Sequence, residues 1–343
     1  MLARLLLVAA TIAASPVLAD ARDLVVAANG SSLQAATRET FARPFTAATG
    51  IATQVATWDG GMEALHAQPK PPDDGWDIVL ADGNTLAAGC SDGTFEKLDW
   101  SVIGGKDHYL PQAVSDCGVG AFANSLALAW NRDKFPATPT WSDFWDVAKY
   151  PGKRGLRRGV QGNLEFALIA DGVAPGDVYK VLGTSDGVDR AFRKLDQLKP
   201  YIVWWQTGGE ATKILASGDV LMTSAPVSDI VIANHTGHHN FAVQWAASLY
   251  DVLSWAIVKG TANQRQATQF LYFAGTPAIE ARLVGAYGEG GWAKGANDGL
   301  PTELAQASPT AAANLNAAVR IDAGFWHDNL AKLRQRFDAW LGH

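Results

Sequence analysis

The residues that could bind a small molecule stand at the ends of predicted strands. A strand predicted over 24–28 is followed by Asn29-Gly30-Ser31-Ser32, and later strand ends carry Trp58-Asp59, Asp82-Gly83-Asn84 and Trp205-Gln206-Thr207. Ligands of open α/β sheets bind beyond the carboxyl ends of the strands. Because these segments combine carboxylate, amide, hydroxyl and indole groups, they predict a site for a small polar solute.

Two motifs of common catalytic sites are absent from the sequence. It contains no HExxH and no phosphate-binding GxxxxGK[ST]. The glycine-rich segment 285–291 lacks the lysine that would follow in a phosphate loop, and we interpret it as a loop near the ligand with Tyr287 as its contact. A secreted hydrolase without a recognisable motif is the alternative from another class.

Three histidines, His235, His238 and His239, lie within the sequence NHTGHH. Neutral imidazoles at close spacing can bind a transition metal, so a metal-binding receptor is a further alternative. A cluster beside Gly237 at a helix end is more often solvated, and we predict neither a metal site nor a cofactor.

The first 19 residues have the layout of a secretory signal peptide. Arg4 precedes an apolar run from Leu5 to Ala14, and Val17-Leu18-Ala19 has the small residues of a cleavage site. The run is far shorter than the roughly 20 residues that span a bilayer. Cleavage near Ala19 would place the mature protein outside the cytoplasm, where ATP- and nicotinamide-dependent chemistry is much less expected.

The composition is that of a globular protein with a mild negative charge. Hydrophobic residues make up 48% and charged residues 18% of the sequence, which excludes a disordered chain. Without the leader, the chain is still long enough for two domains of ordinary size. The formal net charge of −6 argues against a nucleic-acid partner.

The sequence contains two cysteines, Cys90 and Cys117. In an oxidising compartment a single pair is best explained as a disulfide, which would close a loop of about 28 residues. Two free buried thiols and half of a metal site are the alternatives.

Short apolar strands alternate with helical segments along the chain. We predict strands over 24–28, 51–57, 77–80, 127–130, 202–205, 220–224, 241–245 and 253–258. We predict helices over 164–170, 178–182, 188–198, 210–216, 264–274 and 325–341, and one that carries Phe41 and Phe45 and ends at Gly50. This alternation predicts an α/β fold with mostly parallel strands, and the length favours two sheets over one.

Several longer segments resemble one protein family. FxxxTGI at 45–51, WDIVLAD at 76–82, TWSDFWDVAKYPGKRGLRRG at 140–159, WWQTGGEATKILASGDVLMTSA at 204–225 and LYDVLSWAIVKGT at 249–261 resemble bacterial extracellular solute-binding proteins, family 1. The most similar group is the spermidine/putrescine type, the periplasmic binding proteins that serve ABC transporters. The resemblance extends over nearly the whole mature chain.

This resemblance implies a two-lobed periplasmic-binding-protein fold of type II, with a hinge of crossover strands. Lobe 1 would comprise residues 20–125 and 253–305 and lobe 2 residues 126–252, with the C-terminal helices of 306–343 packed on the lobes. It also implies a monomeric receptor without enzymatic activity, which traps a solute between the lobes and delivers it to an ABC permease and its ATPase.

In polyamine-binding relatives, carboxylates hold the ammonium groups and aromatic rings enclose the carbon chain. The corresponding carboxylates are Asp59, Asp82 and Asp251, of which Asp82 could instead cap the next helix. The corresponding aromatic residues are Trp58, Trp205, Trp245, Tyr250, Trp255 and Tyr287. Hydrogen bonds from the end of the first strand are expected from Asn29, Ser31 and Ser32.

Two segments depart from the polyamine-binding pattern. Residues 226–229 read Pro-Val-Ser-Asp where relatives carry an aromatic residue followed by Asn-Gly. Where polyamine binders place acids, this chain has Arg157 and Arg158, with Glu165 as the nearest acid. Because arginine suits a carboxylate or phosphonate, the expected polyamine-like solute has an alternative, a zwitterionic amino acid, an opine or an aminophosphonate.

Overall fold

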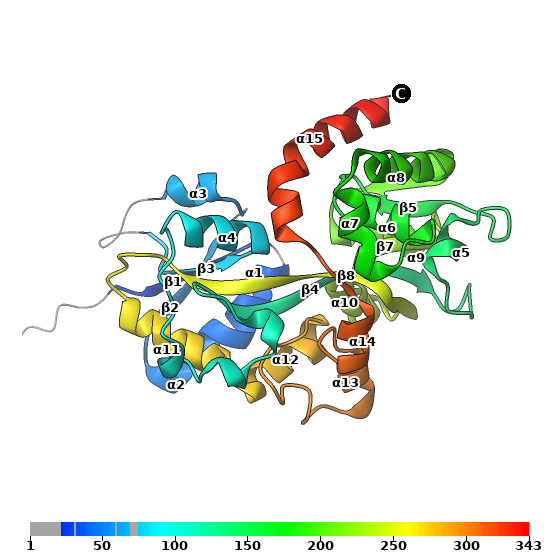
Figure 1. Cartoon of the computed structure of the whole chain (residues 1–343). Helices are drawn as coiled ribbons and strands as arrows, with labels where there is room; N and C mark the ends of the chain where they lie inside the picture. Colours follow the sequence, from blue (N-terminus) through cyan, green and yellow to red (C-terminus); the bar gives the residue numbers. More distant parts are fainter. Residues whose placement is uncertain (1–21, 31, 59, 69–74, 343) are drawn as a thin grey trace, which may run out of the picture.

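Two lobes joined by two long strands make up the molecule (Figure 1). The computed structural model describes residues 22–30, 32–58, 60–68 and 75–342, so the predicted signal peptide lies outside the described residues. The joining strands are β4 (Val119–Asn131) and β8 (Phe241–Ile257). We call the half around β1 to β3 the first lobe and the half around β5 to β7 the second lobe.

The strands form one continuous sheet of order β2-β1-β3-β8-β4-β7-β5-β6, with β9 paired to β8. The remaining strands are β1 (Leu24–Ala28), β2 (Thr53–Thr57), β3 (Ile78–Ala81), β5 (Arg154–Arg157), β6 (Ile202–Trp205), β7 (Met222–Pro226) and β9 (Val319–Arg320). Pairs within each lobe are parallel, whereas β8 runs antiparallel to β3 and β4. The prediction of two separate sheets was wrong, because β4 and β8 pass through both lobes.

Strand β8 unites two segments that were predicted as separate strands. No glycine or proline stands between residues 245 and 253, so no strong turn signal interrupts the chain. Leu126 of β4 pairs with Leu249, but Leu128 pairs with Gln244, which leaves a bulge in β8 between them. Ala247 within this bulge has a φ of 56°. Bulges bend a strand, so the two lobes meet at a bend.

The helices cover the sheet within each lobe. In the first lobe and its extensions they are α1 (Ser32–Ala36), α2 (Arg43–Thr49), α3 (Met62–His66), α4 (Gly83–Ser91), α11 (Gln264–Ala274), α12 (Pro277–Tyr287), α13 (Thr302–Ala307) and α14 (Ala312–Ala317). The others are α5 (Trp141–Trp145), α6 (Asn163–Ala170), α7 (Val178–Leu182), α8 (Ser185–Leu198), α9 (Gly208–Ser217), α10 (Val227–Gly237) and α15 (Ala323–Gly342). A π-helix, η1 (Thr37–Ala42), precedes α2. Single 3₁₀ turns are η2 (Trp100–Val102), η3 (Lys106–His108), η4 (Pro111–Ala113), η5 (Pro175–Asp177) and η6 (Lys199–Tyr201).

Local signals account for several helix ends. The left-handed Gly50, with a φ of 75°, ends α2 as predicted, because glycine adopts this conformation without a steric penalty. The segment 285–291 is not simply a loop, because its first three residues form the last turn of α12, which ends at Tyr287 with Gly288 as its C-cap. Within the described part of the chain, no helix is both long and apolar enough to cross a bilayer.

Each lobe has its own hydrophobic core. In the first lobe, the rings of Phe41, Phe122 and Phe270 surround Trp255 edge to face. The second core includes Trp141, which stacks on Phe166 with ring centroids 3.7 Å apart. As lobe boundaries we propose residues 20–125 and 253–305 for the first lobe and residues 126–252 for the second.

Helix α15 is anchored to the second lobe by a buried carboxylate. Glu165 Oε1 accepts hydrogen bonds from Trp326 Nε1 of α15 at 2.9 Å and from the Tyr179 hydroxyl at 2.8 Å. Its Oε2 accepts the backbone N–H of Gly162 at 2.8 Å. Burial raises the pKa of Glu165. The acid is therefore structural: it connects α15, α7 and the turn that precedes α6.

In the first lobe, the buried carboxylate of Asp77 likewise connects several segments of the chain. It is fully buried and forms an ion pair with Arg22 at 2.6 Å. It also accepts hydrogen bonds from the backbone of Val25 and from the side chains of Thr261 and Asn263. A buried carboxylate with this many donors holds β1, β3 and the segment after β8 together.

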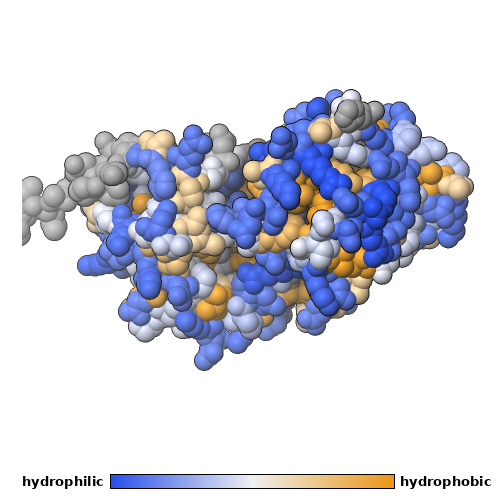
Figure 2. Space-filling view, turned by 45° about the horizontal axis from the view of Figure 1, so that its top comes forward, coloured by the Kyte–Doolittle hydropathy of each residue, from blue (hydrophilic) through white to orange (hydrophobic). Residues whose placement is uncertain are grey.

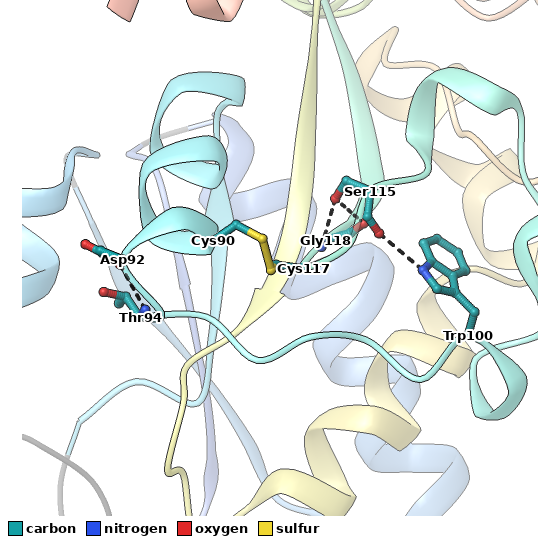
Figure 3. The surroundings of a disulfide bond; sticks show 7 residues. All are labelled: Cys90, Asp92, Thr94, Trp100, Ser115, Cys117 and Gly118. Carbon is teal, nitrogen blue, oxygen red and sulfur yellow. Dashed lines mark hydrogen bonds between the residues drawn. A yellow bond between two sulfur atoms is a disulfide. The ribbon is translucent and has the colours of Figure 1, made fainter.

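The predicted disulfide between Cys90 and Cys117 is present, with Cα atoms 5.7 Å apart. Figure 3 shows the bond between α4 and the chain just before β4. Nearby, Ser115 bridges the turn by donating to the Gly118 carbonyl and accepting from the Gly118 N–H, and its own carbonyl accepts from Trp100 Nε1. The disulfide thus fixes the far end of the helix that Asp82 begins.

Replacing both cysteines by alanine is expected to lower the free energy of unfolding by about 3–4 kcal/mol, because the open loop gains entropy in the unfolded state. Urea unfolding of the mature protein measures this change. A matched loss on reduction of the wild type, and no loss on reduction of the double variant, would complete the test. Equal stabilities of oxidised wild type and double variant would contradict it.

Candidate functional site

A cavity of about 400 Å³ lies beside β4 and β8 and takes its walls from both lobes. From the first lobe come Asn29, Leu33, Asp82 and Asn84. From β4 and β8 come Asn124, Ser125, Leu126, Leu249, Asp251 and Leu253. From the second lobe come Arg157, Gln161, Gly162, Trp205, Gln206, Gly208 and Pro226, and from the C-terminal segment Ile321 and Ala323. The cavity is large enough for a small solute.

Two carboxylates form the acidic end of the cavity. Asp82 caps α4 by accepting the Thr85 N–H at 2.7 Å, as the sequence allowed. Asp251 Oδ1 accepts the Val252 N–H at 2.8 Å. Burial, with a further contribution from the negative charge of Asp82, raises the pKa of Asp251 to about 6. An ammonium group between these carboxylates would replace lost solvation and relieve their repulsion.

Amide side chains surround this acidic end. Asn124 of β4 stands directly opposite Asp251 in the strand pairing. Asn84 Oδ1 is buried and has no hydrogen-bond partner among the described residues. Because buried polar atoms are almost always paired, an unpaired acceptor on a cavity wall indicates a place for a donor of the ligand.

The opposite end of the cavity carries donors. Arg157 ends β5, and Trp205, its partner in the neighbouring parallel strand, ends β6. Trp205 is buried, and its Nε1 is unpaired among the described residues. The backbone N–H of Arg158 donates to the Trp205 carbonyl at 2.7 Å, which fixes the link between β5 and α6. A guanidinium and an indole N–H together suit a carboxylate.

The arrangement therefore separates charge along one cavity. Carboxylates and amide oxygens lie toward the first lobe, and Arg157 and Trp205 lie toward the second. Such a cavity can bind a molecule that carries an ammonium group at one end and an acidic group at the other. Glu165, considered from the sequence as an acid of this region, is fully buried and bound to structural partners instead.

Four of the predicted ligand residues line the cavity: Asn29, Asp82, Trp205 and Asp251. Ser31 and Asp59 lie outside the described residues. Ser32 begins α1. The sequence left open whether Arg157 or Arg158 faces the site, and the structure places Arg157 on its wall.

The structure does not bring the other predicted aromatic residues to the cavity wall. Adjacent residues of a strand point to opposite faces, so beside Asp251 the ring of Tyr250 packs near Trp292. Trp255 lies in the first core, as described above. Trp58 is buried against Trp76, with ring centroids 5.7 Å apart.

Two further aromatic residues also lie away from the cavity wall. Tyr287 ends α12 and packs against the first core. Trp245 lies in the bulge of β8, outside the ladder pairs that flank it. Neither side chain therefore has a place in the ligand contacts that we propose below.

Some cavity residues were missed by sequence reasoning. Asn124 and Ser125 interrupt an apolar strand, and this polar pair was a signal that could have identified them. Ile321 and Ala323 come from the turn between β9 and α15. No local pattern marks them, because only the return of the chain past β8 brings them to the site.

The histidine cluster lies at the end of α10, away from the cavity. His238 follows the helix in a left-handed conformation, and His239 stacks on Phe241 with ring centroids 4.6 Å apart. No three His, Cys, Asp or Glu side chains in the described ranges are grouped so that they could hold a metal ion.

Comparisons with known proteins agree on one family. Residues 40–313 match the family model described as bacterial extracellular solute-binding protein. The chain is 40% identical over 323 residues to the gamma-aminobutyric acid-binding protein of Pseudomonas aeruginosa strain PAO1, covering 94% of this chain and 92% of that relative. It is 24% identical over 269 residues to the putrescine-binding periplasmic protein SpuD of Pseudomonas aeruginosa strain UCBPP-PA14, covering 70% and 71%.

The fold is also that of a solved receptor. The structure of the Atu4243 GABA receptor matches with a TM-score of 0.81 and 29% identity, covering 93% of this chain and 98% of that one. The predicted α/β fold of two lobes is thereby confirmed.

Asp251→Asn is expected to stabilise the unliganded protein at neutral pH. The pKa of Asp251 is about 6 in the folded protein and about 4 for an unfolded aspartate. The folded state thus holds a proton that the unfolded state has released, and wild-type stability falls as pH rises from about 4 to 6. The variant lacks this loss, so its advantage grows from near zero at pH 4 to about 2–3 kcal/mol at pH 7.

Denaturant unfolding of the ligand-free protein at both pH values measures this difference. Asp328→Asn, on the exposed surface of α15, controls for removal of a carboxylate in general. An Asp251→Asn variant that is less stable than the wild type at pH 7, or a difference that does not change with pH, would contradict the assigned pKa.

Proposed function

Because the chain belongs to the family of bacterial extracellular solute-binding proteins, we propose that it captures a short zwitterionic amino acid of the γ-aminobutyrate type. Members of this family are the solute-binding components of ABC importers, which are not enzymes. The chain accordingly binds a solute and delivers it to a membrane permease. The identity of the solute, the residues that hold it, the periplasmic location and the monomeric state belong to the proposal.

The separation of charge within the cavity carries the proposal. The ammonium of the solute binds between Asp82 and Asp251, near the unpaired oxygen of Asn84. Its carboxylate binds Arg157 and the N–H of Trp205 at the other end. A solute with its two charges at opposite ends of a short carbon chain satisfies both sets of groups. The likeness to two GABA-binding proteins supports the same solute.

A polyamine is the second candidate, because the pair Asp82 and Asp251 also suits an ammonium without a carboxylate. A diamine bound there would place its second ammonium toward Arg157. Like charges in a partly desolvated cavity repel. We therefore rank the zwitterion, which was the alternative from the sequence, above the polyamine.

Capture follows from the way in which β4 and β8 join the lobes. Asp82 comes from the first lobe, Asp251 from the joining strand β8, and Arg157 and Trp205 from the second lobe. A bound zwitterion therefore contacts both lobes and favours their approach. The bulge of β8 at Ala247 and the strands around it are the proposed hinge. Release to the permease requires the lobes to separate again. The leader of residues 1–19, cleaved near Ala19, would direct the receptor to the periplasm.

The mature protein, residues 20–343, is expected to bind γ-aminobutyrate more tightly than putrescine. Calorimetry measures both affinities, and a thermal-shift assay gives an independent check. At a hundred times its dissociation constant, the solute adds about 2.7 kcal/mol to the free energy of unfolding. Tighter binding of putrescine would reverse our ranking, and binding of neither would remove both candidates.

Two variants test the assigned ends separately. Asp251→Ala is expected to weaken binding of either amine at least about tenfold, since a charge-assisted hydrogen bond is lost. Arg157→Gln is expected to weaken γ-aminobutyrate by about tenfold and to leave putrescine unchanged or improved. Lys153→Gln, one residue before β5, is the matched control for loss of positive charge. An Arg157→Gln variant that binds γ-aminobutyrate as the wild type does would remove Arg157 from the site.

A further inference from the structure

A second pocket of about 380 Å³ adjoins the cavity on the side of the second lobe. Arg157, Gln161 and Gln206 belong to the walls of both. We call this second pocket the annex. Because three residues are shared, the annex lies directly beside the basic end of the cavity, and Arg157 borders both.

Three arginines from two elements meet in the annex. Arg157 and Arg158 lie at the end of β5 and just after it, and Arg334 comes from α15. Among the described residues, none of the three forms an ion pair with a carboxylate. Asp338 also lines the annex, so three positive side chains face one negative side chain. Such an excess of guanidinium groups in a concave pocket attracts an anion.

The two walls of the annex are held in place by one buried group. Glu165 binds the Gly162 N–H, at the end of the link that carries Arg157 and Arg158. It also binds Trp326 of α15, two turns before Arg334. Leu330 and Phe337 of α15 line the annex between these polar groups. The arginines therefore stand on a preorganised frame rather than on separate loops.

The annex opens to solvent. In Figure 1, α15 begins between the lobes and continues along the second lobe. In the face shown in Figure 2, strongly hydrophilic residues gather over the second lobe, and hydrophobic residues show between them. Because Arg158 and Arg334 on the walls of the annex are exposed, a free anion and the end of a bound solute can both reach them.

We propose that the annex is a second anion subsite, which takes a carboxylate or phosphate group at Arg158 and Arg334. The proposal rests on the proposed function in one respect, because Arg157 is assigned to the carboxylate of the short amino acid. The anion in the annex is either the far end of a longer amine-bearing solute or a free inorganic anion. The receptor would then accept amines with a more distant acidic group than that of γ-aminobutyrate.

Calorimetry of the mature protein at constant ionic strength tests the annex with three probes. Inorganic phosphate reports a free anion, γ-aminobutyryl-glycine reports a tethered carboxylate, and γ-aminobutyrate reports the cavity alone. The test variant is Arg158→Gln with Arg334→Gln. The control is Lys153→Gln with Lys332→Gln, which removes the same charge from two exposed positions outside the annex. Constant salt matters because exposed charges are screened.

We expect the test variant to bind phosphate or γ-aminobutyryl-glycine about tenfold more weakly than the wild type and the control. A loss of affinity for phosphate alone indicates that the annex binds a free anion. A loss of affinity for γ-aminobutyryl-glycine alone indicates that it binds the acidic end of a longer solute. Equal binding of both probes by the test variant and the control overturns the proposal. Failure of γ-aminobutyrate to bind the wild type counts against the proposed function only, because phosphate binding still decides the annex.

Discussion

The antiparallel pairing of β4 and β8 determines how the two lobes and the cavity between them are arranged. These two strands are the longest in the sheet, and they are the elements that carry it from one lobe into the other. Their pairing places Asn124 opposite Asp251 and Leu126 opposite Leu249, all on the cavity wall. The bulge in β8 between Gln244 and Leu249 bends the two strands where the lobes meet. The same hydrogen-bonded ladder thus joins the lobes, positions the cavity and provides the proposed hinge.

The cavity holds groups that folding alone does not satisfy. Asp251 is kept beside Asp82 in a poorly solvated place, and the N–H of Trp205 and the Oδ1 of Asn84 are unpaired among the described residues. Each of these features costs stability in the empty protein. Firmly built surroundings offset the cost: the two aromatic cores, the disulfide at the far end of α4, and the buried networks of Asp77 and Glu165. A ligand of complementary charge would supply the missing hydrogen bonds and neutralise the repulsion between the carboxylates.

Charge, more than shape, distinguishes the solutes considered for this receptor. The acidic end of the cavity suits polyamines and amino acids equally, since both carry an ammonium group. The residues that we propose to discriminate between them are at the other end, where Arg157 and Trp205 are paired on β5 and β6. The annex extends this basic end through Arg158 and Arg334. In our proposal, the position of the acidic group along the solute therefore decides which solutes the second lobe binds.

The amino-acid sequence is sufficient to predict the family, the α/β fold, most strand and helix positions, the disulfide and four cavity residues, because these depend on local apolar patterns, caps and strand ends. It also showed that Arg157 and Arg158 depart from the polyamine-binding pattern. It could not decide which arginine faces the cavity or that Trp255 and Trp58 are core residues, since an apolar ring has the same local pattern in a core and in a cleft. These points depend on how segments that are distant in sequence pack together. Strand register placed Asp251 on the wall and turned Tyr250 away from it, and the return of the chain through β9 into α15 brought Ala323 and Arg334 beside residues that are distant in sequence.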